Sequence, residues 1–278
     1  MTLAWSEDFE PDRIRPFPAL PLPEPASEWA FGGSDGGGVR VAVVDSGIDR
    51  SHPLVGAVAG GMVFEPDDDV DGGVRVDERD HDDVAGHGTA VAGIIRALAP
   101  SCELWSLRVL GENVRGRAAV FAKAVEWATE QRFDVLNLSL STSNEAWFSR
   151  FHALADAAYF AGSVVVCAVN NVPAPTYPSQ FASVISVASS GPPGSPLAYN
   201  VEPPAEFGAP GLDVPVAWPG GGTATVTGNS FAAPYVSGLV ALIRSKHPGL
   251  PCHSVKAALA AVCENARPSA NPSDMSAR

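Results

Sequence analysis

Apolar residues are distributed along the chain in two patterns, short continuous runs and longer runs with helical spacing. The continuous runs predict buried strands at residues 39–44, 104–110, 135–140, 164–169 and 184–188. The helically spaced runs predict helices at residues 87–99, 118–131, 145–161, 229–246 and 253–263. Strands that alternate with helices are typical of a mainly parallel sheet covered on both faces. The sequence therefore predicts a three-layer α/β domain.

The stretch from Gly228 to Lys246 combines a loop with a buried helix. Asn229 is a residue type that caps helices, and this places Ser230 in the first turn. Unpaired N–H groups and the positive end of the helix dipole would stabilise an oxyanion there. A capped core helix whose serine bonds its own backbone explains the same residues. The stretch alone leaves both interpretations open.

Two other segments supply the base and the carboxylate that a serine nucleophile needs. The apolar run 41–44 ends in Asp45, at the carboxyl end of a predicted strand, where open α/β sheets carry their chemistry. His87 lies between two glycines and opens an apolar helix. The chain therefore contains the three residue types of a nucleophile, a base and an orienting acid.

The segments Asp45-Ser-Gly-Ile, His87-Gly-Thr and Ser230-Phe-Ala-Ala-Pro, in this order, resemble the subtilisin-type serine proteases. The resemblance covers about residues 36–265. It implies a subtilisin-like fold and a serine endopeptidase that forms an acyl-enzyme. In that scheme Ser230 is the nucleophile, His87 the general base and then acid, and Asp45 the group that orients the imidazole.

The resemblance also indicates an oxyanion donor. Asn171 follows the predicted strand 164–169, where the family has Gly-Asn and the asparagine side chain donates to the oxyanion. Asn170 replaces that glycine, which asparagine tolerates because it visits the left-handed region more readily than most residues. A loop with two turn-forming asparagines is the alternative. Asn229 stands where the family usually has threonine, which leaves one auxiliary hydrogen bond open.

The segments 109–116 and 137–142 resemble those between which subtilisins clamp an extended peptide as an added strand. Ser141 and Thr142 stand where the family usually has two glycines. Their side chains should narrow the pocket for the substrate residue before the cleaved bond, so we expect narrower specificity than that of a digestive protease. An acidic substrate side chain would suit Arg115, although an exposed arginine is more often only solvated. The substrate-binding residues that the resemblance implies are Val114, Arg115, Gly116, Ser139, Leu140 and Ser141.

The chain ends differ in composition from residues 36–265, which we assign to the catalytic domain. Residues 1–35 form a Pro/Gly-rich extension, expected to be extended chain that leads into a flexible joint. This extension either packs along the surface or lies across the cleft and blocks it, as in intracellular subtilisins. Residues 266–278 are expected to be a polar tail.

Composition and net charge limit the classes of partner that the protein is expected to bind. The 278 residues, 46% of them hydrophobic, suffice for one large domain, and the net charge of −13 disfavours nucleic acids and anionic membranes. No apolar run reaches the roughly 18 residues of a membrane span, and no signal peptide is recognisable, so we expect a cytoplasmic protein. Its four cysteines are expected to be unpaired thiols in a reducing compartment, and Cys252 and Cys263 lie too far apart on one predicted helix to bridge.

The acidic runs at residues 67–71 and 77–83 suit either a calcium site or a solvated loop. Their spacing matches no EF-hand loop, so we expect no cofactor and no metal ligands. The expected activity is selective processing of a peptide precursor inside the cell. A transpeptidase or macrocyclase on the same scaffold and a non-catalytic peptide-binding module are the alternatives. The oligomeric state stays open.

Overall fold

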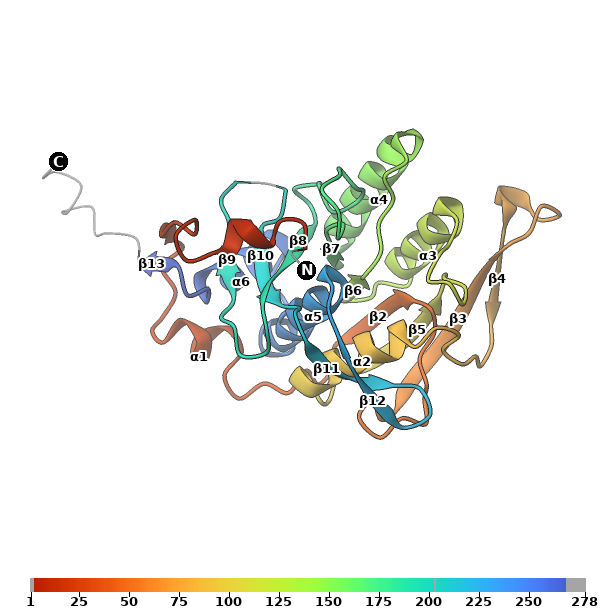
Figure 1. The fold of residues 1–278 in the computed structure, drawn as a ribbon, viewed down its shortest axis with the longest axis horizontal. Coiled ribbons are helices and arrows are strands. Elements are labelled where there is room, and N and C mark those ends of the chain that lie inside the picture. Colours follow the sequence, from red (N-terminus) through yellow and green to blue (C-terminus); the bar gives the residue numbers. More distant parts are fainter. Residues whose placement is uncertain (1–2, 203, 269–278) are drawn as a thin grey trace, which may run out of the picture.

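Nine strands form the central sheet of this computed structural model, which describes residues 3–202 and 204–268 (Figure 1). They are β2 (Arg40–Asp45), β3 (Val58–Pro66), β4 (Val74–Glu78), β5 (Glu103–Arg108), β6 (Val135–Leu138), β7 (Val164–Ala168), β8 (Ile185–Gly191), β9 (Ala198–Tyr199) and β10 (Phe207–Pro210). Their order is β4-β3-β5-β2-β6-β7-β8-β10-β9. Neighbouring strands are parallel except in the pairs β3–β4 and β9–β10.

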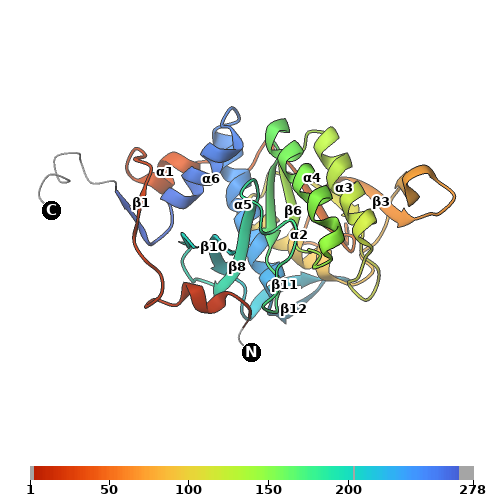
Figure 2. The same ribbon diagram turned by 90° about the horizontal axis from the view of Figure 1, so that it is seen from above.

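Helices cover both faces of this sheet (Figure 2). One layer contains α1 (Ala26–Phe31), α2 (His87–Leu98), α5 (Asn229–Lys246) and α6 (Cys252–Ala261). The opposite layer contains α3 (Ala118–Glu130) and α4 (Phe148–Ala161). The predicted three-layer, mainly parallel α/β fold is confirmed.

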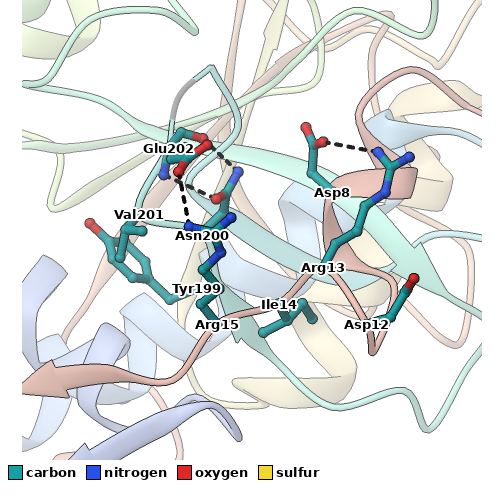
Figure 3. Close-up of a pocket in the computed structure, with 9 residues that line it drawn as sticks. All are labelled: Asp8, Asp12, Arg13, Ile14, Arg15, Tyr199, Asn200, Val201 and Glu202. Carbon is teal, nitrogen blue, oxygen red and sulfur yellow. Dashed lines mark hydrogen bonds and ion pairs between the residues drawn. The ribbon is translucent and has the colours of Figure 1, made fainter.

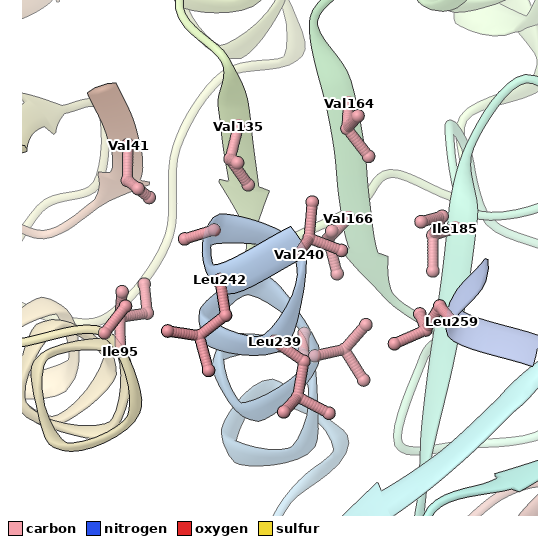
Figure 4. Packing of buried hydrophobic residues seen from close by; sticks show 14 of the residues in the cluster. Val41, Ile95, Val135, Val164, Val166, Ile185, Leu239, Val240, Leu242 and Leu259 are labelled. Atoms are coloured by element: carbon pink, nitrogen blue, oxygen red, sulfur yellow. The ribbon is translucent and has the colours of Figure 1, made fainter. Parts of the chain in front are cut away.

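Alternate residues of the central strands enter the two layers. In β2, Val41 and Val43 pack in the cluster that contains α2 and α5, whereas Ala42 and Val44 pack in the cluster that contains α3 and α4. Side chains of α5 meet this sheet in Figure 4, which labels Val41, Val135, Val164, Val166, Leu239, Val240 and Leu242. Because both faces are buried, a central strand is apolar at successive positions, and this is why continuous apolar runs identified these strands.

The predicted bounds agree with the observed elements to different degrees. The bounds of α5 agree with the predicted helix 229–246, whereas the predicted helix 145–161 divides into a 3₁₀ turn at Glu145–Trp147 and α4. The sequence patterns did not predict β3, β4, β9, β10 or the hairpin of β11 (Val214–Trp218) with β12 (Gly222–Val226). Residues of β12 are exposed or half-buried, so they form no continuous apolar run.

The amino-terminal extension is packed against the domain, which agrees with the alternative of a surface-packed segment and corrects the expectation of extended chain with a flexible joint. It contains a 3₁₀ turn η1 (Ser6–Phe9), the strand β1 (Phe17–Ala19) and α1, and β1 pairs with β13 (Ala266–Pro268). The ring of Trp29 in α1 stacks on His247, with 4.3 Å between centroids. Long-range contacts therefore override the local preference of a proline-rich sequence. Residues 269–278, most of the expected polar tail, lie outside the described residues.

All four cysteines are buried and unpaired, as expected. Burial raises the pKa of the Cys102 thiol to about 11 and also raises the pKa of Cys167, Cys252 and Cys263. These thiols are therefore protonated and unreactive at neutral pH. Within the described part of the chain, no helix has the length and apolar character to cross a bilayer.

Replacing Phe151 by alanine tests the layer of α3 and α4. Phe151 is fully buried and lies 4.7 Å from the ring of Phe121, so Phe151→Ala should lower the free energy of unfolding by about 3–5 kcal/mol. Phe160 in the same helix is 83% exposed, and Phe160→Ala should change that free energy by less than about 0.5 kcal/mol. Chemical denaturation of both variants measures the difference, and equal losses would contradict the assigned packing.

Candidate active site

The end of β2 and the start of α2 hold a buried acid against a histidine. Asp45 is fully buried, and its two carboxylate oxygens lie 2.8 and 2.9 Å from Nδ1 of His87. The backbone N–H of Ser46 donates to the same carboxylate at 2.8 Å. A carboxylate can only accept, so Nδ1 carries the proton and Nε2 of neutral His87 is free to accept one. The sequence prediction of an orienting acid beside a base agrees with this geometry.

Asp83, which the sequence analysis did not single out, holds the loop before His87. One of its carboxylate oxygens accepts hydrogen bonds from Ser46 Oγ and from the backbone N–H groups of residues 85 and 86. The other oxygen accepts from the N–H and the hydroxyl of Thr89, so Asp83 satisfies donors at the start of α2. Its position four residues before the histidine, in an acidic run, was the only signal available from sequence.

The pKa of His87 is raised above its ordinary value of 6.5. Burial acts to lower the pKa of this imidazole, but the adjacent charge of Asp45 and its hydrogen bond outweigh burial, and the charge of Asp83 adds to them. The site therefore favours the imidazolium form that a general base passes through when it has taken a proton.

Ser230 lies in the first turn of α5, as the sequence predicted. Four residues later Pro234 lacks the N–H that would bond the carbonyl of Ser230. The hydroxyl of Ser139 donates to that carbonyl at 2.9 Å in place of the missing helix bond. In return, the hydroxyl of Ser230 donates to the carbonyl of Ser139 at 3.2 Å. Because Pro234 leaves the carbonyl of Ser230 without a helix bond, Ser139 can join the start of α5 to the residue that follows β6.

Two buried hydrogen bonds connect Ser139 to Asn137 and Asn137 to Ser237. Ser237 in α5 donates to Oδ1 of Asn137 at 2.8 Å, and Nδ2 of Asn137 donates to Ser139 Oγ at 3.0 Å. All three side chains are buried, so each hydrogen bond also spares a desolvated polar group. This chain of hydrogen bonds runs from β6 into the helix that carries the nucleophile.

The start of α2 lies beside the start of α5. The ring of His87 lies 5.2 Å from the ring of Phe231, the residue after Ser230. Both helices start at the carboxyl edge of the parallel strands, where Asp45 and Asn171 also lie. The structure therefore brings residues from four distant segments to one edge of the sheet.

Asn229 does not cap α5, which corrects one expectation. Gly228 occupies the cap position without a side-chain bond, and Asn229 is the first helical residue. The backbone N–H of Asn229 donates to Oδ1 of Asn171 at 2.9 Å. The oxyanion candidate itself caps the helix, because it accepts one of the first-turn N–H groups that have no intrahelical partner.

The two predicted cleft segments line one cavity of about 280 Å³. Arg115 is exposed at its rim, and Thr142 is tied to Tyr177 by two backbone hydrogen bonds of 3.0 and 2.9 Å. Ser139 is buried against Ser230 and does not line this cavity. The predicted residues that do line it are Val114, Arg115, Gly116, Leu140 and Ser141.

His81 and His52 have structural contacts. His81 in the second acidic run is buried, and its ring nitrogens lie 2.8 Å from Ser106 Oγ and 3.0 Å from the carbonyl of Arg79. His52 is buried and lies 2.7 Å from the carbonyl of Gly222. Among residues 3–202 and 204–268, no three His, Cys, Asp or Glu side chains form a group suited to a metal ion.

Comparisons with known proteins identify a family and related sequences. The sequence profile of the subtilase family matches residues 36–273. The thermostable alkaline protease of Halalkalibacterium halodurans is 32% identical over 233 residues, which are 80% of this chain and 61% of that protein. Subtilisin NAT of Bacillus subtilis subsp. natto is 33% identical over 232 residues, which are 78% of this chain and 58% of that protein. The chain thus spans about three fifths of these two relatives.

Solved structures show the same fold. Sphericase matches with a TM-score of 0.64 at 23% identity, over 84% of this chain and 87% of that chain. A cold adapted subtilisin-like serine proteinase matches with a TM-score of 0.61 at 23% identity, over 92% of this chain and 89% of that chain.

The pKa of His87 should respond to the charge of Asp83. An NMR titration should place the wild-type pKa above 6.5, and Asp83→Asn should lower it because a negative charge that favours the imidazolium is removed. Asp35→Asn is the control, since that carboxylate bonds Gly37 and Ser101 on another part of the surface. An unchanged or higher His87 pKa in Asp83→Asn would contradict the assignment.

Proposed function

This chain belongs to the subtilase family, and from that premise we propose that it is a serine endopeptidase that cleaves an extended peptide. The observation that carries the proposal is the buried contact of Asp45 with His87 Nδ1, which leaves Nε2 as a base beside the start of α5. A binding module gains nothing from a buried acid and histidine at this edge of the sheet. Peptide hydrolysis uses both groups.

Acylation begins when Ser230 Oγ attacks the substrate carbonyl carbon. Its proton leaves the hydrogen bond to Ser139 O and passes to His87 Nε2, while Asp45 stabilises the imidazolium. The carbonyl oxygen becomes an oxyanion, which the side-chain amide of Asn171 and the backbone N–H of Ser230 bind. The imidazolium then gives its proton to the departing amine, and the C–N bond breaks.

Deacylation repeats these steps with water. His87 takes a proton from water, the resulting hydroxide attacks the ester carbonyl, and the imidazolium returns the proton to Ser230 Oγ as the C–O bond breaks. The carboxylic acid product leaves. No cofactor takes part in this scheme.

The proposed substrate is a particular peptide precursor, processed inside the cell. The cavity between residues 109–118 and 140–142 supports this proposal, because its walls are the two segments between which an extended chain would pair as an added strand. Ser141 and Thr142 are half-buried beside this cavity, and the bridge to Tyr177 limits how far that segment can move aside. The net charge of −13 supports a peptide partner over nucleic acid or an anionic membrane.

The four buried, unpaired thiols support a reducing compartment such as the cytoplasm. A transpeptidase or macrocyclase would share every residue of the site and would differ only in resolving the acyl-enzyme with an amine. Product mass distinguishes these reactions, because hydrolysis adds one water to the acyl fragment, transpeptidation adds the second amine, and macrocyclisation adds neither since its amine belongs to the same fragment. A non-catalytic module would give neither product.

Covalent labelling tests the assembled nucleophile and base. A fluorophosphonate probe should add one adduct mass to the wild type and none to Ser230→Ala or His87→Ala, because phosphonylation needs both the hydroxyl and its base. Asn171→Ala should still be labelled but should lose about 10²–10³ in kcat, which is the known effect of removing the corresponding donor from a subtilisin. A folded wild type that takes no label would refute the peptidase proposal.

A peptide library tests the narrow pocket. Wild type should cleave a restricted set of peptides, and the double change Ser141→Gly, Thr142→Gly should broaden that set, because both substitutions remove side chains beside the cavity. Arg115→Gln should reduce any preference for acidic residues without changing cleavage of neutral peptides. The matched control is Arg132→Gln, a substitution outside the residues that line this cavity. Uniform cleavage of the library by wild type would contradict narrow specificity.

A further inference from the structure

The first described residues of the chain meet the oxyanion loop beside the nucleophile. The N–H of Ala4 donates to the backbone carbonyl of Asn171 at 3.2 Å, and the carbonyl of Ala4 accepts from Nδ2 of Asn229 at 3.3 Å. We propose that residues 3–9 hold the oxyanion donor in place, with Asn229 as the positioning residue that joins them to Asn171. The inference rests on the proposed peptidase function and identifies a support of that same site.

The orientation of the Asn171 amide depends on Asn229. The backbone N–H of Asn229 can only donate, so its partner at 2.9 Å is the oxygen of the Asn171 side chain. Fixing the oxygen also fixes the nitrogen on the other arm of the amide. That nitrogen lies beside Gly228, since a Cβ built on this glycine would be 3.7 Å from it. Asn171 is exposed, so this bond keeps its amide from turning in solvent.

The side chain of Asn229 is fully buried and bonds three separate segments. Its oxygen accepts from the N–H of Ser189 in β8 at 2.9 Å. Its nitrogen donates to the carbonyl of Asn170 at 3.0 Å and reaches the carbonyls of Ala4 and Val169 at 3.3 and 3.4 Å. A threonine hydroxyl has one hydrogen to donate, whereas this amide has two. Asparagine can therefore serve the oxyanion loop and the amino-terminal segment together.

Apolar burial holds the segment in this position. Leu3 and Ala4 are each 6% exposed, and Phe9 is 4% exposed in a cluster with Val169 and Ala188. Phe9 lies so close to Gly208 that a Cβ on this glycine would be 2.4 Å from its ring. Val169 directly precedes Asn170, so the same cluster supports the loop from its other side. The segment 3–9 and the loop at Asn170 and Asn171 are therefore held by the same apolar cluster.

A second contact lies further along the amino-terminal extension, outside residues 3–9, and offers a matched control. Arg15 pairs with Glu202 in the turn at 199–202 at 3.8 Å, and Arg13 pairs with Asp8 of the extension itself at 3.9 Å (Figure 3). Asn265 donates to the carbonyl of Arg15 at 3.0 Å and is 7% exposed. Asn265 thus holds the extension at Arg15 through a buried amide, and among the described residues it has no hydrogen bond to Asn171.

The contacts of the amino-terminal segment indicate that it supports the oxyanion loop and does not block the cleft. Among the described residues, the cavity between the cleft segments is lined by none from the amino-terminal extension. The hydrogen bonds of Ala4 instead lead to the back of the oxyanion loop and to the start of α5. A segment in this place leaves the cleft open and restricts the donor.

Kinetics on full-length variants test the proposal. Asn229→Ala should lower kcat by about 10- to 100-fold with KM changed less than about twofold, because a misplaced donor weakens binding of the transition state alone. Ala4→Pro removes the N–H bound to Asn171, while it also fixes the local backbone, and should lower kcat by about three- to tenfold. Asn265→Ala should leave kcat unchanged while it loses stability comparable to that lost by Asn229→Ala.

The decisive comparison uses the Asn171→Ala background. If Asn229 and Ala4 act through the Asn171 amide, neither substitution should lower kcat further once that amide is absent. Losses that multiply in the Asn171→Ala background would overturn the proposal, because they would reflect general damage. A rise in kcat for Ala4→Pro would also overturn it, since the segment would then restrain the enzyme.

A spectroscopic readout separates this inference from the peptidase proposal. The side-chain NH₂ signals of Asn171, assigned by their loss in Asn171→Ala, should shift or broaden in Asn229→Ala and Ala4→Pro but not in Asn265→Ala. A wild type without turnover that shows this pattern would refute the peptidase function and retain the support. Unchanged NH₂ signals in both variants would refute the support whatever the activity.

Discussion

The burial of the Asp45 carboxylate is the constraint on which the site depends. A charge with no exposed surface is stable only if fixed donors surround it, and here His87 and the N–H of Ser46 supply them. The backbone carbonyl of the same residue accepts from Val109 and Leu110, which begin one wall of the cleft. Satisfying one buried residue therefore fixes the end of β2, the start of α2 and the entry to the cleft together.

Most of the fold and the chemical centre could be predicted from sequence because both leave local signals. Buried strands such as β7 are apolar over their whole length, the helix α5 has apolar residues at helical spacing, and the segments around Asp45, His87 and Ser230 are specific in their order. Edge strands leave weaker signals. In β12 no residue is fully buried, so its sequence has no reason to be continuously apolar.

Positioning residues could not be predicted because their partners are distant in sequence. Ser139 looked like part of a substrate wall, yet its hydroxyl replaces a helix bond that Pro234 cannot make, 95 positions along the numbering. Asn229 looked like a helix cap, but its side chain bonds residues in three other segments. The composition of the amino-terminal extension predicted extended chain with a flexible joint. Composition reflects only the local preference of the backbone, so it could not predict that Phe9 packs over Gly208. Such roles depend on tertiary contacts.

The position of the nucleophile follows from the way α5 is buried. A helix inside a protein must leave its first-turn N–H groups without intrahelical partners, and burial removes the water that would otherwise bond them. Asn171 takes the N–H of Asn229, and the N–H of Ser230 follows it at the edge of the sheet. A transient negative charge is the partner that such a donor binds most strongly. The donors that are costly in a buried helix start are therefore the ones that can stabilise an oxyanion, which is why the serine stands there.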